Sequence, residues 1–422
     1  MEVLELAMSP NSDRGIKDPP AAVAAAPPQR RAGQCQSTFS WKIAGVLLML
    51  TISALQIFLS NLKVYLPKDN DNTTAQVAPA KSGRGYVGDP FRNNQEYQPG
   101  SAEQYIMSNS DQLGFNKPDN PATCHIWSDP NATTPEVFHS LVTYKKDIDE
   151  YNEIIKKFKP IPSIMDKLRR GGVEQQSAQQ ICDILRLHPD GMKGIFPSEQ
   201  LSFTSSGYVE PLLPPMRSHK ICENFRSHLM SLAYLVHDFE FMCRKLKPTS
   251  RLVLLDMGAA LDFHGTNQPI VTLLRQYEKF GFVFDHIYGF EIKEKDPKVV
   301  YEMSLPEEYM ASYHWINIGV SAKEGDKLNP LHSVIKKFNE DDFVVVKLDI
   351  DTSSVEVPLA LQLLEDKDGV YSKIIDQFYF EHHVHLGELK NNWGRSMNGT
   401  VGESLELFSN LRKKGIPAHY WP

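Results

Sequence analysis

The chain has 422 residues, of which 41% are hydrophobic and 23% are charged, so it is long enough for more than one ordinary domain. Its net charge of -7 argues against nucleic acid as the main partner. The composition is that of a globular protein with an additional N-terminal part, and no internal repeat is visible.

The N-terminal part divides into a polar tail and an apolar segment. Residues 1–41 are rich in Ala, Pro and polar residues, which predicts a disordered tail. Residues 43–60 carry no charge and are just long enough to span a bilayer, so we expect a transmembrane signal anchor at 42–62. A cleavable signal peptide is the alternative, but the long polar leader favours an uncleaved anchor.

Three Asn-X-Thr sequons, at Asn72, Asn131 and Asn398, all follow this span. Each fits glycosylation in a secretory lumen, whereas the positive charges flanking the span give only a weak orientation bias. We therefore expect a single-pass protein with a cytosolic N-terminus and a lumenal C-terminal domain. Its architecture is typical of a protein of the Golgi or another secretory-pathway membrane.

Four cysteines also follow the span, and a fifth, Cys35, precedes it. The four are Cys124, Cys182, Cys222 and Cys243. In a lumen they could form up to two disulfides with three possible pairings, and in the cytosol they would be small buried residues. None has the Cys-x-x-Cys spacing of a metal site.

Residues 63–133 are dominated by Asn, Asp, Pro, Gly and Gln, which predicts a flexible stem. A helical lead-in region follows at 134–247 and opens at Thr134-Pro135 with an N-cap residue and a proline at the first helical position. Apolar residues at 137–158 then alternate spacings of four and three. They indicate either a coiled-coil seam, which would allow a homodimer, or one helix lying on the domain. A second helix is expected at 221–245.

Strands and helices alternate from residue 248 to the C-terminus. The apolar runs predict strands at 251–256, 283–291, 313–320, 343–349 and 374–381, helices at 268–280, 330–338, 355–364 and 401–414, and a short strand ending at Trp421. This alternation predicts an α/β, Rossmann-like open and mostly parallel sheet with helices on both faces. The transmembrane helix, the stem and the helical segment would precede it.

Acids follow the strands where such a sheet binds ligands. Asp349 and Asp351 come directly after the apolar run 343–348, and acids there are costly to bury unless they bind something. Their alternative role is to cap the next turn. Asp256 and Gly258 stand at the end of the first strand, and an acid with a glycine turn at this place is typical of a nucleotide site. Glu291 ends the second strand, where an acid accepts hydrogen bonds from a ribose.

With these motifs, residues 251–420 resemble a class I S-adenosylmethionine-dependent methyltransferase of the FkbM type. Lys347-Leu-Asp349-Ile-Asp351 with Glu356 is similar to the family's Lys-x-Asp-x-Glu-Gly signature, and Glu381-His382-His383 is similar to the acid and histidine that end its fifth strand. The resemblance covers about two fifths of the chain.

The resemblance implies S-adenosylmethionine as the cofactor. Asp256, Gly258 and Ala260 would lie beside its methionine part, Glu291 beside the ribose and Asn317 beside the adenine. Ala260 stands where the family has a further glycine. The acceptor would be a glycan or another small hydroxyl-bearing molecule of the secretory pathway.

Proton transfer from such a hydroxyl needs a base, and imidazole suits neutral pH. Asp349, Asp351, His382 and His383 are the candidate catalytic residues. In an extended segment successive side chains face opposite ways, so His383 would share a side with Glu381 and His382 would face away.

Three alternatives remain open. Asp349-x-Asp351 is similar to the Asp-x-Asp motif with which lumenal glycosyltransferases hold a divalent cation and a nucleotide-sugar. Asp351, Glu381 and His383 could hold a metal within a methyltransferase domain, although the sequence alone leads us to expect no metal. The domain could also have kept the fold and lost its cofactor.

Overall fold

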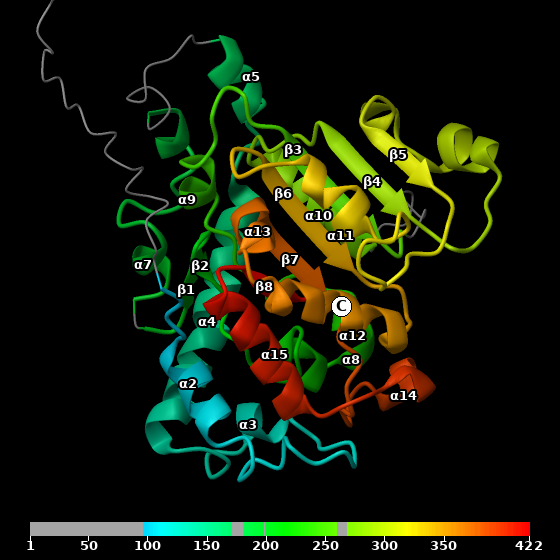
Figure 1. Cartoon of the computed structure of the whole chain (residues 1–422). Coiled ribbons are helices and arrows are strands. Elements are labelled where there is room, and N and C mark those ends of the chain that lie inside the picture. The colour runs from blue at the N-terminus through cyan, green and yellow to red at the C-terminus, as the bar shows by residue number, and fades with distance from the viewer. Residues whose placement is uncertain (1–95, 171–179, 198, 260–267) are drawn as a thin grey trace, which may run out of the picture. The chain divides into compact units, whose positions relative to one another are not determined.

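The computed structural model describes residues 96–170, 180–197, 199–259 and 268–422 (Figure 1). The expected tail, the anchor at 42–62 and the Asn72 sequon lie outside these residues. Within the described residues, no helix is long and apolar enough to cross a membrane.

The central element is a six-stranded parallel sheet with the strand order β5-β4-β3-β6-β7-β8 (Figure 1). The strands are β3 (Leu252–Met257), β4 (His286–Phe290), β5 (Tyr313–Ile316), β6 (Phe343–Leu348), β7 (Ile375–Phe380) and β8 (Ala418–Tyr420). This is the order of a doubly wound sheet, and it reverses between β3 and β6, where such sheets bind ligands at their carboxyl edge. The predicted α/β class and parallel sheet are confirmed.

Helices cover both faces of this sheet, as two adjacent residues of β7 demonstrate. The Tyr379 hydroxyl lies 3.0 Å from that of Tyr277 in α10 (Pro269–Lys279), whereas Phe380 stacks on Phe408 of α15 (Val401–Lys413). Successive strand residues point to opposite faces, so α10 and α15 lie on opposite sides. β3 and β6 are buried at every position, including Asp256 and Lys347, as their mainly apolar runs predict.

The remaining elements are short, apart from α12 with its 13 residues. The helices are α5 (Ile164–Arg170), α7 (Met192–Ile195), α11 (Pro330–Ser333), α12 (Ser353–Glu365), α13 (Val370–Ile374) and α14 (Lys390–Trp393). One-turn 3₁₀ helices lie at Glu307–Tyr309, Ile335–Lys337 and Gly394–Ser396, and a π-helix at Val299–Ser304. A hairpin of β1 (Ser202–Thr204) and β2 (Gly207–Val209) precedes the sheet.

The helix expected at 221–245 is wrong. The chain forms a 3₁₀ turn at His219–Cys222 and the short helices α8 (Phe225–His228) and α9 (Phe239–Cys243). Between them the backbone bonds to distant side chains, since the amide of Val236 donates to Glu210 and that of His237 to the Tyr151 hydroxyl. Tertiary contacts thus replace the hydrogen bonds of a helix.

The helix at the start of the lead-in region is present as α4 (Pro135–Lys157), with Thr134 as its N-cap. Leu141, Tyr144, Ile148 and Tyr151 of its apolar stripe are buried within the chain itself. The stripe expected for dimerisation therefore packs on the domain, as the second of the two alternatives predicts.

The flexible stem expected at 63–133 does not extend over residues 96–133. These residues form α2 (Ser101–Ser108) and α3 (His125–Ser128) and bury Ile106, Phe115 and Ile126 completely. Two disulfides, Cys124–Cys222 and Cys182–Cys243, select one of the three possible pairings. The first of them ties the former stem to the segment before the sheet.

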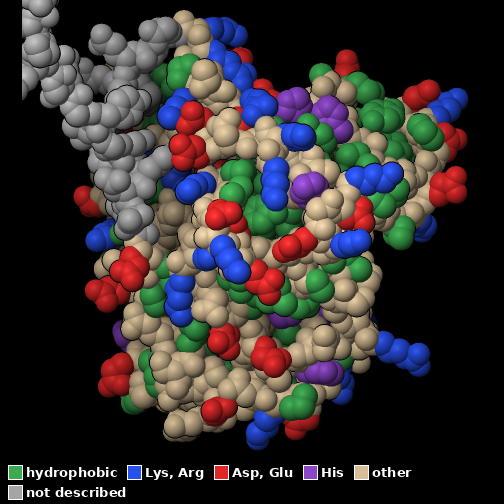
Figure 2. Space-filling model, in the orientation of Figure 1, with side chains coloured by type: hydrophobic (Ala, Val, Ile, Leu, Met, Phe, Trp, Pro, Cys, Tyr) green, Lys and Arg blue, Asp and Glu red, His purple; other side chains and the backbone are tan. Residues whose placement is uncertain are grey.

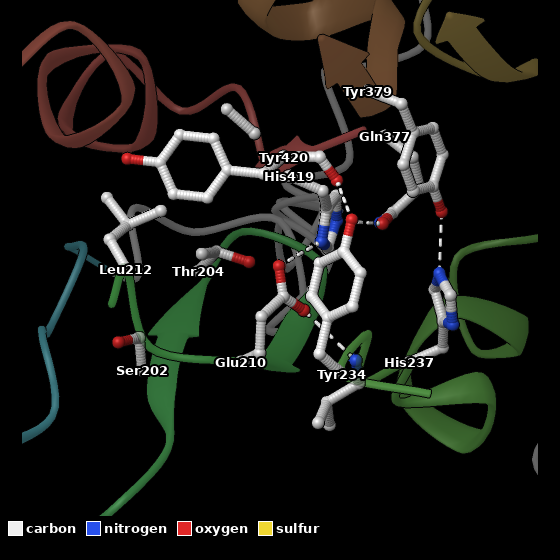
Figure 3. A network of polar contacts seen from close by, with 12 residues as sticks. Ser202, Thr204, Glu210, Leu212, Tyr234, His237, Gln377, Tyr379, His419 and Tyr420 are labelled. Atoms are coloured by element: carbon white, nitrogen blue, oxygen red, sulfur yellow. Dashed lines mark hydrogen bonds and ion pairs between the residues drawn. The ribbon is translucent and has the colours of Figure 1, made fainter. Parts of the chain in front are cut away.

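A buried polar network joins these N-terminal segments to the last helix and strand, and Figure 3 shows the part of it around Glu210, His419 and Gln377. Arg412 of α15 is almost fully buried and lies 3.5 Å from the carboxylate of Glu103 in α2 and 3.3 Å from that of Glu210. Glu210 also contacts His419 of β8 at 2.7 Å, and His419 contacts Gln377 of β7 at 2.7 Å. The sequence did not predict this packing, because residues 96–133 have the polar and acidic composition of a solvated linker.

We expect Arg412→Met to lower the free energy of unfolding by about 3 kcal/mol or more, because two buried carboxylates lose their cation. Lys413→Met, an exposed neighbour in the same helical turn, should change it by about 0.5 kcal/mol or less. Urea unfolding of both variants measures the difference. Equal losses in the two variants would contradict the role of the network.

Candidate functional site

Lys347 of β6 holds together the exits of the two central strands. Its ammonium lies 3.0 Å from a carboxylate oxygen of Asp256 and 3.0 Å from one of Asp349, and it donates to the Gly258 carbonyl at 2.8 Å. Asp256 pairs with Lys347 directly across the β3–β6 ladder. The two carboxylates raise the pKa of Lys347 although burial opposes the charged form. Asp256 is thus committed to this ion pair.

Gly258 makes the turn after β3 with a φ of +88°, a value that L side chains rarely adopt. A Cβ atom there would lie 1.5 Å from the Asp349 carbonyl oxygen, so the glycine is required by the close approach of the two strand exits. The amides of Gly258 and Ala259 both donate to the Phe290 carbonyl at 2.9 Å. The β3 turn and the end of β4 are therefore in contact, and Ala260 lies outside the described residues.

Glu291 and Asn317 lie together beyond β4 and β5. The Asn317 amide donates to the carbonyls of Glu291 at 2.7 Å and Lys293 at 2.9 Å, and one Glu291 carboxylate oxygen accepts from the Lys293 amide at 2.6 Å. Asn317 thus shapes the loop in which Glu291 lies.

Apolar side chains are exposed on this side of the molecule. Ile292 is 78% exposed and Ile318 41% exposed, and an added Cβ at Gly319 would lie 2.8 Å from Ile292, which brings the two loops together. Figure 2 shows hydrophobic side chains gathered where β5 and the connection before it form the surface.

Asp349 and Glu381, at the ends of β6 and β7, form a hydrogen-bonded carboxyl pair. Asp349 accepts from the Trp421 indole at 3.1 Å, and its burial raises its pKa to about 7. Glu381 is equally buried, but the hydrogen bond from His383 and the charge of Arg217, 2.7 Å away, hold its pKa below the ordinary value. The shared proton therefore resides on Asp349.

The two candidate histidines face opposite ways, as the alternation predicts. His383 lies 3.0 Å from the Glu381 carboxylate and 3.8 Å from that of Asp351. Burial opposes its protonation, but the bond to Glu381 raises its pKa. His382 contacts the Ser404 hydroxyl at 2.9 Å and stacks on Phe380, and burial lowers its pKa to about 3. Only His383 joins the acids.

Asp351 projects into solvent from a φ of +55°, and its side chain is 83% exposed. The cap of this turn is Glu356, whose carboxylate accepts from the Ile350 amide at 2.7 Å and whose pKa is raised to about 6 by burial. Glu356, and not Asp351, therefore caps this turn.

Sequence reasoning missed three residues of this edge: Arg217, Trp393 and Ser396. Arg217 and the Trp393 indole both donate to Glu381, at 2.7 Å and 3.0 Å, and Ser396 contacts His383 at 2.5 Å. Arg217 lies 164 residues before Glu381 in a Pro-Pro loop, and no periodic pattern links the two.

A cavity of about 1030 Å³ lies elsewhere, near Tyr97, Phe196 and Tyr208, and includes none of the residues at this edge. Comparisons with protein-family models, curated proteins and solved structures gave no match to the chain. The strongest indication of function is therefore the geometry of the carboxyl edge itself.

Because the pKa of Asp349 is raised from 3.8 to about 7 in the folded state, its protonated form stabilises the fold below pH 4, and this stability is lost as the pH rises through 7. We expect wild type to lose on the order of 2 kcal/mol relative to Asp349→Asn between pH 4 and pH 8. Urea unfolding across this range measures the difference. A constant difference would show that Asp349 is ionised throughout.

Proposed function

We propose that the chain is an S-adenosylmethionine-dependent methyltransferase. The observation that carries the proposal is the contact between the β3 turn and the end of β4, which brings the turn of Gly258 beside Glu291 at the carboxyl edge. An acid at the end of the second strand, next to the turn after the first, is placed to accept hydrogen bonds from a ribose diol. The cofactor, when bound, supplies the reactive methyl group.

The exposed apolar residues support a nucleoside on this side of the edge. Ile292 and Ile318 extend from the loops that follow β4 and β5 and flank Glu291 and Asn317. Exposed isoleucines on touching loops are typical of a surface that an apolar partner covers. An adenine ring between them would bury both side chains while the ribose contacts Glu291.

The other half of the edge supports proton transfer from an acceptor hydroxyl. The pKa of Asp349, about 7, suits a base at neutral pH, and Asp351 is exposed where an acceptor can reach it. His383 orients Glu381, whereas His382 is bonded to Ser404 and packed on Phe380. We therefore assign proton transfer to the Asp349–Glu381 pair and acceptor contact to Asp351, and give His382 a packing role.

The proposed location is a secretory-pathway membrane, with the domain in the lumen. The two disulfides fit an oxidising compartment, and the sequon residues Asn131 and Asn398 are both exposed. A glycan or another hydroxyl-bearing molecule of that compartment is the proposed acceptor.

The glycosyltransferase alternative is weakened by the pairing of Asp349. Its carboxylate contacts Lys347 and the Trp421 indole, so Asp349 and Asp351 are not two free acids facing one cation. The inactive alternative predicts no binding of either cofactor class.

We expect S-adenosylhomocysteine to raise the Tm of the full chain by several degrees at about 100 times its Kd, where binding adds about 2.7 kcal/mol. Glu291→Gln should reduce this affinity by about tenfold or more, because it removes the charge that a ribose diol contacts. Glu294→Gln, an exposed acid three residues on, is the matched control and should bind as wild type does.

A thermal-shift titration with S-adenosylhomocysteine measures all three proteins. Stabilisation of wild type by a nucleotide-sugar with Mn²⁺ in place of S-adenosylhomocysteine would favour the glycosyltransferase. No response to either would favour the inactive domain, and an unchanged response of Glu291→Gln would remove Glu291 from the site.

A further inference from the structure

Three side chains of different kinds meet beside the Asp349–Glu381 pair. A carboxylate oxygen of Asp351, one of Glu381 and the Nε2 atom of His383 all lie within 4.8 Å of one another. They come from the exits of the adjacent strands β6 and β7. We call this group the β6–β7 cluster.

The proton positions on His383 follow from its neighbours. The Ser396 hydroxyl donates its only hydrogen to the Trp393 carbonyl at 2.6 Å, so it can only accept from Nδ1 of His383 at 2.5 Å. In the neutral ring, Nε2 then carries a lone pair. That buried atom has no hydrogen-bond donor and lies 3.0 Å from the Glu381 carboxylate. Either a proton on Nε2 or a cation bound between the two atoms relieves this contact of a lone pair with a carboxylate.

Glu381 is oriented as firmly as His383. Its Oε1 atom accepts from Arg217 at 2.7 Å and from the Trp393 indole at 3.0 Å, which leaves Oε2 directed at His383. Histidine and carboxylate ligands of metals are held in this way by hydrogen bonds from their far atoms. Asp351 adds a third potential ligand atom, a carboxylate oxygen on the solvent side, 3.8 Å from Nε2.

The charge at this edge also calls for a cation. Even with the shared proton on Asp349, the other carboxyl groups of this edge outnumber the permanent cations among the described residues, since Asp256, Asp351, Glu356 and Glu381 face Lys347 and Arg217. Lys347 is occupied by Asp256 and Asp349. The Asp351 side of the cluster has no permanent cation within ion-pair distance in the described residues.

We propose that the β6–β7 cluster binds a divalent transition cation, with Nε2 of His383 and carboxylate oxygens of Glu381 and Asp351 as ligands. Ligands at about 2.0–2.2 Å from a cation lie about 3 Å apart. His383 and Glu381 already have this spacing at 3.0 Å, and the exposed Asp351, 3.8 Å from Nε2, would move closer on binding. One imidazole with two carboxylates suits Mn²⁺ or Zn²⁺ better than Mg²⁺ or Ca²⁺. The exposed side of Asp351 leaves coordination positions open to water or to an oxygen of an acceptor.

The test compares two variants, Asp351→Asn and Asp368→Asn, each of which loses one exposed carboxylate, inside and outside the β6–β7 cluster respectively. Asp351→Asn keeps the side-chain shape, and Asn tolerates the φ of +55° as well as Asp does, so the fold should be retained. Asp368→Asn makes the same change on an exposed residue that precedes β7, at the opposite edge of the sheet. His383→Gln removes the nitrogen ligand as a second test.

The experiment is calorimetric titration of the EDTA-treated full chain with MnCl₂ and, separately, ZnCl₂, without any cofactor. We expect one site in wild type and in Asp368→Asn, and an affinity at least about tenfold weaker in Asp351→Asn and His383→Gln. Equal Tm values in EDTA confirm that Asp351→Asn is folded.

Several outcomes would overturn the cation site. They are no binding of either ion to wild type, equal binding by wild type and Asp351→Asn, or equal weakening in Asp368→Asn. In each case the cluster is an ion pair of protonated His383 with Glu381. The titration is independent of methyl transfer, so a cation site without S-adenosylhomocysteine binding would reject the proposed function alone.

Discussion

A single buried ammonium organises the carboxyl edge of this protein. Lys347 stands in a strand that is otherwise apolar and buried at every position, and it is tolerable there because Asp256 and Asp349 both lie 3.0 Å away. Through these contacts it joins the exits of β3 and β6 where the strand order reverses. Because the two strand exits approach each other so closely, residue 258 has to be a glycine. The ion pairs of Lys347 therefore account for three of the residues predicted from the sequence to form the site, namely Asp256, Gly258 and Asp349.

The edge has two halves of different chemistry on either side of this ammonium. Beyond β4 and β5 the surface offers one acid, an amide and exposed isoleucines, a combination suited to a nucleoside. Beyond β6 and β7 it offers acids and an imidazole fixed by Arg217, Trp393 and Ser396. The proposed methyl transfer would use such a division, since donor and acceptor have to be held in the right geometry to react.

The elements that were predicted correctly from the sequence are those whose structure is determined by their own residues. The runs at 252–257 and 343–348 are apolar except for Asp256 and Lys347, because both faces of the sheet are covered, and α4 and α10 begin with proline at the first turn. Prediction failed where distant partners decide. The segment 221–245 bonds to side chains such as Tyr151 and Glu210, and the place of Arg217 beside Glu381 has no local signal.

The burial of Glu103 against Arg412 has a consequence for how the domain can be separated from whatever precedes it. Residues 96–133 read as a tether, yet α2 supplies a carboxylate to the last helix, and a disulfide fastens Cys124 to Cys222. Loss of α2 through a cut within this stretch would leave the buried guanidinium of Arg412 with Glu210 but without Glu103. A cut that keeps both of these contacts within the domain therefore has to fall before residue 96.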